Sequence, residues 1–280
     1  MMEFFVGTVE WSTGPKSFLT VVWTWADHPG EAVHLILQAA KSNQIPDPVL
    51  IDLDYCDLED LPDDAVEVGK HSFIDPSEYS FPTEYSYKFP HGVIPVRGGE
   101  DETDIDEIQP GYEVWKDDEG LINVEAVVER DRLFDVYMAL VERLPSIRVF
   151  WIKLHEDWEE FGMEEIYASE DLNDVTCIRD FLKENWSDTV LNGHVTITTY
   201  ADEGQTNLNI SDHKMIVALT FDEEITKLCQ SYFNELGLKQ YDPLLSISGG
   251  VHHWHYRSVS GRDRKDLVKL LVEKGFVLFD

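Results

Sequence analysis

The order β-α-β-β-α-β occurs twice in succession between residues 121 and 280, and it restricts the folds that the chain can form. Strands are indicated by short apolar runs, and helices by apolar residues spaced three and four positions apart. The first unit covers residues 121–203 and the second covers residues 204–280. The expected elements of the first unit are a strand at 122–128, a helix from Asp131, strands at 147–154 and 163–168, a helix from Asn173 and a strand at 194–200.

The second unit has clearer signals at its helix ends and turns. Asp222 is a typical helix N-cap, and Gly237 stands where a helix-terminating glycine is expected. The dipeptide Gly249-Gly250 is typical of a tight hairpin turn. The expected elements are a strand at 214–221, a helix at 222–237, strands at 244–248 and 251–257, a helix at 263–274 and a strand at 276–279.

Together, these patterns predict an α+β protein with tandem ferredoxin-like (βαββαβ) units in residues 121–280. A smaller α+β region at 1–97 precedes them, and its first two strands are expected at 4–10 and 18–25. The acidic segment 98–120 is predicted to be a solvated loop that links the two parts. A fold of this kind carries little information about function, because unrelated proteins share the same element order.

The composition is that of a folded chain outside the membrane. Hydrophobic residues make up 43% and aromatic residues 12%, which is enough to build a core. No apolar run reaches the roughly 18 residues that a membrane span needs, and the first residues lack the basic region of a signal peptide. Cys56, Cys177 and Cys229 are odd in number and widely spaced. We therefore expect a cytoplasmic protein with reduced thiols and no contact with a membrane.

The negative charge of the chain is concentrated before residue 241. The formal net charge is -33, yet residues 241–280 contain six basic and five acidic side chains, so residues 1–240 carry -34. Such a surface repels nucleic acid, because every phosphate contact needs a positive partner. The acidity could complement a basic protein, hold cations loosely or keep the protein soluble.

A basic protein partner is the favoured explanation of this charge. An immunity or inhibitor protein is its most concrete form, since such proteins bind basic partners through acidic surfaces. The carboxylates expected to contact the partner lie in two short acidic stretches. They are Asp57, Glu59, Asp60, Asp63, Asp64, Glu156, Asp157, Glu159 and Glu160.

The densest polar segment is the run His-His-Trp-His-Tyr-Arg that follows the predicted hairpin turn. Residues two apart on a strand share a face, so His253, His255 and Arg257 are expected on the open face of the sheet. Trp254 and Tyr256 are expected to pack beneath helices on the opposite face. The candidates for binding a ligand or anion are His253, His255, Arg257, Arg262 and Arg264.

Several interpretations of this strand compete. The side chains could simply cover an open sheet face. Two imidazoles two residues apart also suit a metal ion, with a third ligand from His213, His194 or a carboxylate. The arginines could bind an anion near the start of the last helix, or a histidine could act as an acid or base. Asp212-His213 is expected to lie in a turn.

The sequence lacks the signatures of the common enzyme classes. We find no phosphate-binding loop, no dinucleotide-binding glycine pattern, no nucleophile elbow and no HExxH zinc motif. The preferred interpretation is therefore a binding protein without catalytic activity and without a cofactor. The alternative is a metal- or anion-dependent enzyme, or a small-ligand binder, that uses residues 249–264.

Overall fold

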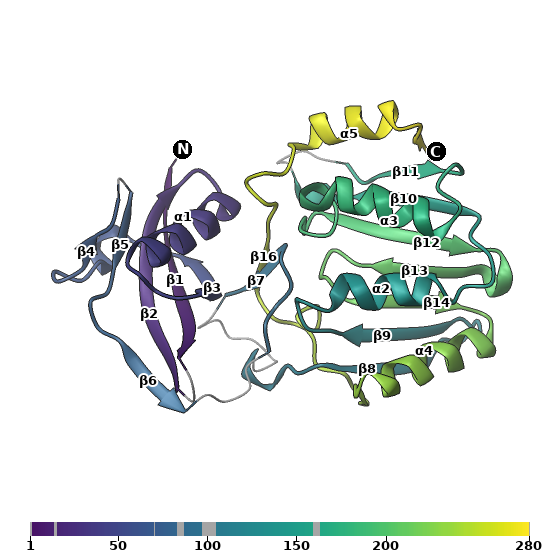
Figure 1. Ribbon diagram of the computed structural model, residues 1–280, viewed down its shortest axis with the longest axis horizontal. Helices are drawn as coiled ribbons and strands as arrows, with labels where there is room; N and C mark the ends of the chain where they lie inside the picture. The colour runs from purple at the N-terminus through teal and green to yellow at the C-terminus, as the bar shows by residue number, and fades with distance from the viewer. Residues whose placement is uncertain are drawn as a thin grey trace.

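The computed structural model describes residues 2–13, 16–69, 71–82, 87–96, 105–158 and 163–279. It confirms a mixed α+β architecture in which two separate sheets lie beside each other, with a short two-stranded ribbon between them (Figure 1). None of the helices in these ranges is long and apolar enough to cross a membrane.

The N-terminal sheet has the strand order β3-β1-β2-β5-β4, and β6 also pairs with β2. Helix α1 (Pro29–Ser42) packs against it and buries Ile36, whose neighbours in the core include Phe5 and Leu53. The backbone N–H of Glu31 donates to Nδ1 of His28 and thereby caps the helix. The strands are β1 (Glu3–Thr13), β2 (Lys16–Ala26), β3 (Val49–Tyr55), β4 (Val66–Glu67), β5 (Ser72–Ile74) and β6 (Tyr79–Pro82).

The larger sheet has nine strands in the described part of the chain, in the order β15-β8-β9-β14-β13-β12-β10-β11-β17. All its pairings are antiparallel except that of β15 with β8. Its strands are β8 (Gly111–Lys116), β9 (Ile122–Val127), β10 (Val149–Leu154), β11 (Glu165–Ser169), β12 (Val195–Ala201), β13 (Thr206–Ile210), β14 (Ile216–Thr220), β15 (Lys239–Gln240) and β17 (Val277–Leu278).

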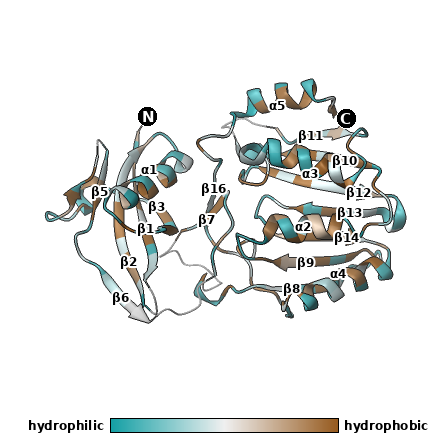
Figure 2. Cartoon of the chain, in the orientation of Figure 1, coloured by the Kyte–Doolittle hydropathy of each residue, from teal (hydrophilic) through white to brown (hydrophobic). Residues whose placement is uncertain are grey.

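Helices cover one face of this sheet. On β10, Phe150, Ile152 and Leu154 are fully buried, whereas the alternate residues Trp151 and Lys153 are only partly buried. These buried residues form one cluster with apolar residues of the four helices that cover this sheet. Figure 2 shows the hydrophobic colour on β9 and α2. These helices are α2 (Leu133–Val141), α3 (Val175–Glu184), α4 (Glu223–Glu235) and α5 (Arg264–Glu273).

The tandem ferredoxin-like arrangement is not confirmed. In such a unit the first and third strands lie next to each other, but β9 pairs with β8 and β14, whereas β11 pairs with β10 and β17. The strands of the two predicted units instead join in one continuous sheet. Residues 111–116 of the expected acidic loop form β8, where Tyr112 is buried in the core.

The predicted hairpin around Gly249-Gly250 is wrong. Residues 244–248 are not a strand, and β16 (His253–His255) pairs antiparallel with β7 (Val93–Pro95), far away in the sequence. This two-stranded ribbon lies between the two large sheets (Figure 1). The C-terminal segment therefore crosses back toward the N-terminal sheet before it forms α5.

Candidate metal centre

The strand β16 points its alternate side chains toward the two different sheets. His253 and His255 share one side, as their spacing predicted, and their ring centroids are 5.0 Å apart. Trp254 faces the other way, where its Nε1 donates to the backbone oxygen of Leu53 at 3.2 Å. Trp254 and Tyr256 pack against the N-terminal core rather than beneath helices of the larger sheet.

Very close backbone contacts hold the end of β16 in place. The N–H of Tyr256 donates to the oxygen of Gly92 at 2.9 Å, and the N–H of Gly193 donates to the oxygen of Tyr256 at 2.9 Å. A Cβ on Gly193 would lie 1.8 Å from the oxygen of Gly92, so a side chain cannot fit there. The loop before β12 is thereby fixed beside the histidine strand.

Three histidines converge at this place. His213 lies in the turn between β13 and β14, as the sequence predicted, and comes together with His253 and His255. One ring nitrogen of each lies within 4.8 Å of the others, and the two Nε2 atoms of His253 and His255 are 3.1 Å apart. All three side chains are partly buried.

Neighbouring groups orient two of these rings for metal binding. Nδ1 of His253 lies 2.6 Å from the backbone oxygen of Val251, and Nδ1 of His213 lies 3.1 Å from Oδ1 of Asp212. A carbonyl or carboxylate oxygen only accepts, so each Nδ1 carries a proton, and Nε2 is the nitrogen that can bind a metal ion. This pattern of a histidine that donates its second nitrogen to an oxygen is typical of metal ligands.

Asp212 also contacts a histidine that we did not predict from the sequence. Its Oδ2 lies 3.6 Å from Nδ1 of His155, whose Nε2 is 2.8 Å from Oγ1 of Thr196. His155 follows β10 directly, and β10 pairs with β12, which in turn pairs with β13. The antiparallel pairing therefore brings the C-terminal ends of β10 and β13, which are distant in sequence, to either side of the N-terminal end of β12.

A second group of ligand atoms lies on the other side of His255. Oδ2 of Asp157 is 3.0 Å from Nδ1 of His255 and 3.3 Å from Nδ1 of His194. Asp157 belongs to the 3₁₀ turn Glu156–Trp158, and Trp158 stacks on His194 with ring centroids 5.6 Å apart. Asp157 is thus part of the histidine cluster rather than only of an acidic surface.

The electrostatics favour the protonation states that a metal ion requires. Burial lowers the pKa of His253, which stays neutral at pH 7. Burial opposes ionisation of Asp157 and Asp212, but the contacts with the histidines outweigh it and hold both pKa values well below the usual range. Neutral imidazoles and ionised carboxylates are the forms that bind a cation.

The candidate arginines are already engaged within the protein. The guanidinium of Arg262 pairs with the buried carboxylate of Asp188, and that of Arg257 donates to the oxygen of Gly261 at 2.7 Å. Arg264 is almost fully buried, where it contacts Glu165 and the oxygen of His155. The three guanidinium groups therefore already donate to other groups of the protein. The structure does not bring them together with His255 as donors for an anion.

The acidic candidates separate into different places. Residues 57–64 lie at the exposed 3₁₀ turn that follows β3, with every predicted carboxylate exposed: Asp57, Glu59, Asp60, Asp63 and Asp64. Glu156 is exposed as well. Glu159 and Glu160 lie outside the described residues. Docking of a basic partner on these side chains stays a prediction.

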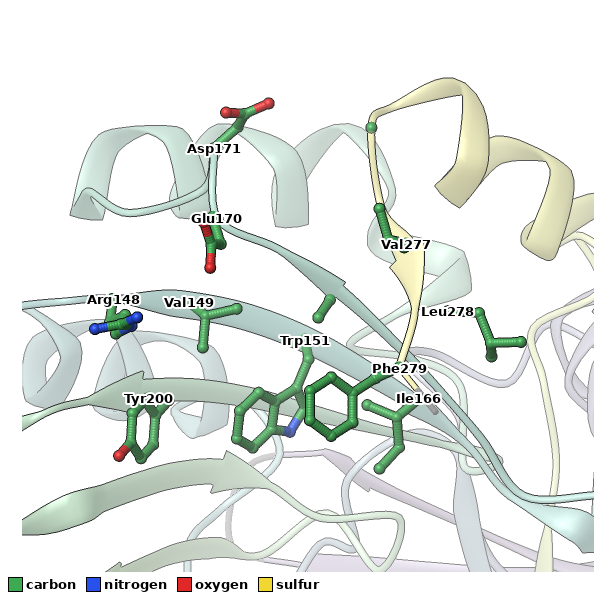
Figure 3. A pocket seen from close by; sticks show the side chains of 12 residues that line it. Arg148, Val149, Trp151, Ile166, Glu170, Asp171, Tyr200, Val277, Leu278 and Phe279 are labelled. Carbon is green, nitrogen blue, oxygen red and sulfur yellow. The ribbon is translucent and has the colours of Figure 1, made fainter.

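A separate hollow of about 740 Å³ lies on the open face of the larger sheet, beside β17 (Figure 3). Trp151 and Tyr200 stack on its floor with ring centroids 5.8 Å apart, and Phe279 lines its side. Its described lining includes no histidine or cysteine, and its acidic residues are Glu170 and Asp171. The histidine cluster at β16 is therefore separate from this hollow.

Comparison with known proteins adds no assignment. The chain matches no family model, no curated protein and no solved structure. The histidine cluster itself is therefore the basis for a proposal about function.

Proposed function

We propose that this protein binds a divalent transition-metal ion at His213, His253 and His255. The convergence of three imidazole nitrogens within 4.8 Å of one another supports the proposal most directly. The rings come from two segments about 40 residues apart in sequence, and two of them donate Nδ1–H to an oxygen acceptor. Imidazole ligands favour Zn²⁺, Cu²⁺ and Ni²⁺ over the oxygen-seeking ions Mg²⁺ and Ca²⁺.

Three protein ligands favour a catalytic type of metal site over a structural one. Structural zinc sites are closed by four protein ligands, whereas catalytic zinc sites use three and keep one position open for water. Bound water loses a proton more readily because the ion stabilises hydroxide. The activity that this arrangement would support is metal-assisted hydrolysis, in which water held at the open position would supply the nucleophile.

His155 lies behind Asp212 at such a site. Burial lowers its pKa, so the ring is neutral at pH 7. Its contact with Asp212 connects it to His213. In this proposal His155 is a positioning residue, because it reaches the ligand His213 through Asp212.

Metal analysis tests the proposed function. The untagged full chain is freed of metal with a chelator and titrated with Zn²⁺ by calorimetry, with His34→Gln as control, since that histidine is exposed on α1. We expect tight zinc binding by the wild type and the control. The double variant His253→Ala/His255→Ala should lose it while unfolding as cooperatively as the metal-free wild type. Zinc binding that survives in the double variant would rule out this site.

A further inference from the structure

We infer that the site holds two metal ions and that the imidazole of His255 bridges them. The inference rests on the proposed function, because the first ion is the one held by His213 and His253. The second ion is bound by Asp157 and His194. The geometry points to a divalent ion of the same class, since this second set offers two imidazole nitrogens and one carboxylate oxygen.

The two nitrogens of His255 face two different sets of ligands. Its Nε2 lies 3.1 Å from Nε2 of His253, on the side of His213. Its Nδ1 lies 3.0 Å from Oδ2 of Asp157, on the side of His194. The two nitrogens of an imidazole point away from each other, so they cannot bind the same ion. Because the ring of His255 belongs to both groups of ligands, each group must hold its own ion.

The distances between donor atoms match those around a tetrahedral ion. Zinc–nitrogen bonds of about 2.0–2.1 Å place two tetrahedral ligands about 3.3 Å apart. In the first group the two Nε2 atoms are separated by 3.1 Å. In the second group Oδ2 of Asp157 lies 3.0 Å from His255 and 3.3 Å from His194. These three pairs of donor atoms thus already have the spacing of ligands that share an ion.

The contact between His255 and Asp157 indicates where the second ion would lie. Nδ1 of His255 is buried, and Oδ2 of Asp157 lies 3.0 Å from it. Nε2 of the same ring lies 3.1 Å from Nε2 of His253, on the side of the first ion. A cation between Nδ1 and Oδ2 would accept an electron pair from each of these two atoms.

Bridging also defines the proton balance of the site. A neutral His255 carries one ring N–H, and both nitrogens must be free to bind an ion each. The ring loses that proton to solvent when the second ion binds, and the two ions share the resulting negative charge. The exposure of Asp157, whose side chain is 46% accessible, gives the second ion a route from solvent.

Zinc stoichiometry in the full chain tests the inference. Metal-free protein is dialysed against Zn²⁺, and bound zinc is measured by elemental analysis. We expect about two ions per wild-type chain and about one in Asp157→Asn or His194→Gln, because the three-histidine group stays intact. His255→Ala should retain neither ion. His34→Gln is the matched control, and it should bind as much zinc as the wild type.

The possible outcomes separate the two proposals. One ion in the wild type that is unaffected by Asp157→Asn overturns the second site and leaves the proposed function standing. Retention of one ion in His255→Ala overturns the bridge. Absence of zinc from the wild type overturns both proposals. Urea unfolding of each metal-free variant tests whether the chain is folded. If His194→Gln is unfolded, Asp157→Asn alone tests the second site.

Discussion

The oxygen of Gly92 occupies the position next to Gly193 that a side chain would need, 1.8 Å from where its Cβ would be. This contact joins the segment before β7 to the loop before β12, and Tyr256 bonds to both. His194 directly follows Gly193, and His255 directly precedes Tyr256. The geometry of the candidate metal centre therefore depends on two glycines that bind no ligand.

We predict that Gly193→Ala destabilises the protein by about 3 kcal/mol or more, because the backbone of Gly92 or Tyr256 must move to admit the methyl group. Zinc affinity should fall with it. Gly249→Ala is the matched control, since a Cβ there meets only ordinary contacts at 3.4 Å. Urea unfolding and zinc calorimetry measure both effects. Equal stability of the two variants would show that the close contact does not hold this loop.

Asp157 and Asp212 should respond differently to loss of charge. Asp212 orients His213 without being a proposed ligand, so Asp212→Asn should weaken zinc binding about 10–100-fold and leave the number of bound ions unchanged. Asp118→Asn removes an exposed carboxylate in the β8–β9 turn and should have no effect. Competition with a coloured zinc chelator measures these affinities. A changed stoichiometry in Asp212→Asn would make Asp212 a ligand.

Acid should destabilise the protein partly through His91. Burial, together with the charge of Arg130, lowers the pKa of His91 to about 4. The unfolded chain binds this proton near pH 6.5, so the stability is complete above that pH and is lost as the pH falls toward 4. The full contribution is about 3 kcal/mol, from 2.5 pH units at 1.36 kcal/mol each.

His91→Gln should therefore lose less stability than the wild type when the pH is lowered from 7.5 to 4.5. Urea unfolding at a series of pH values measures this slope. His34→Gln, which removes an exposed histidine, should follow the wild type. Parallel curves for wild type and His91→Gln would show that His91 is not buried as a neutral ring.

The three thiols should differ in reactivity. Burial raises the pKa of Cys229 to about 12 and that of Cys56 to about 11. The hydrogen bond with Asp174 raises the pKa of Cys177 as well, but this thiol alone among the three is exposed, at the start of α3. At pH 8 a disulfide reagent should label Cys177 first, and all three thiols should react in denaturant. Cys177→Ser should abolish the fast phase. A fast phase that persists in this variant would contradict the burial of the other two.

Part of the site followed from local sequence patterns. The two-residue period of a strand placed His253 and His255 on one side, and the polar composition around Asp212 predicted the turn that presents His213. Both are properties of a few neighbouring residues. They do not depend on how distant segments pair, and the structure confirms them.

The rest depended on non-local pairing. His155 follows a buried strand, and nothing in its own neighbourhood marks it as a site residue. It meets Asp212 only because β12 lies between β10 and β13. The prediction of a hairpin at Gly249-Gly250 was wrong for the same reason, since β16 pairs with β7, which lies more than 150 residues away in the sequence. The order of strands within the larger sheet is likewise set by pairing that the sequence does not encode locally.

The position of Trp254 between two histidines couples metal binding to the arrangement of the whole molecule. Its ring is anchored in the N-terminal core, while its two neighbours point to ligands carried by the larger sheet. The halves cannot separate without pulling the imidazoles apart. If the site binds metal as proposed, the free energy of binding would oppose separation of the two halves. Metal binding would thereby stabilise the association of the two parts of this single chain.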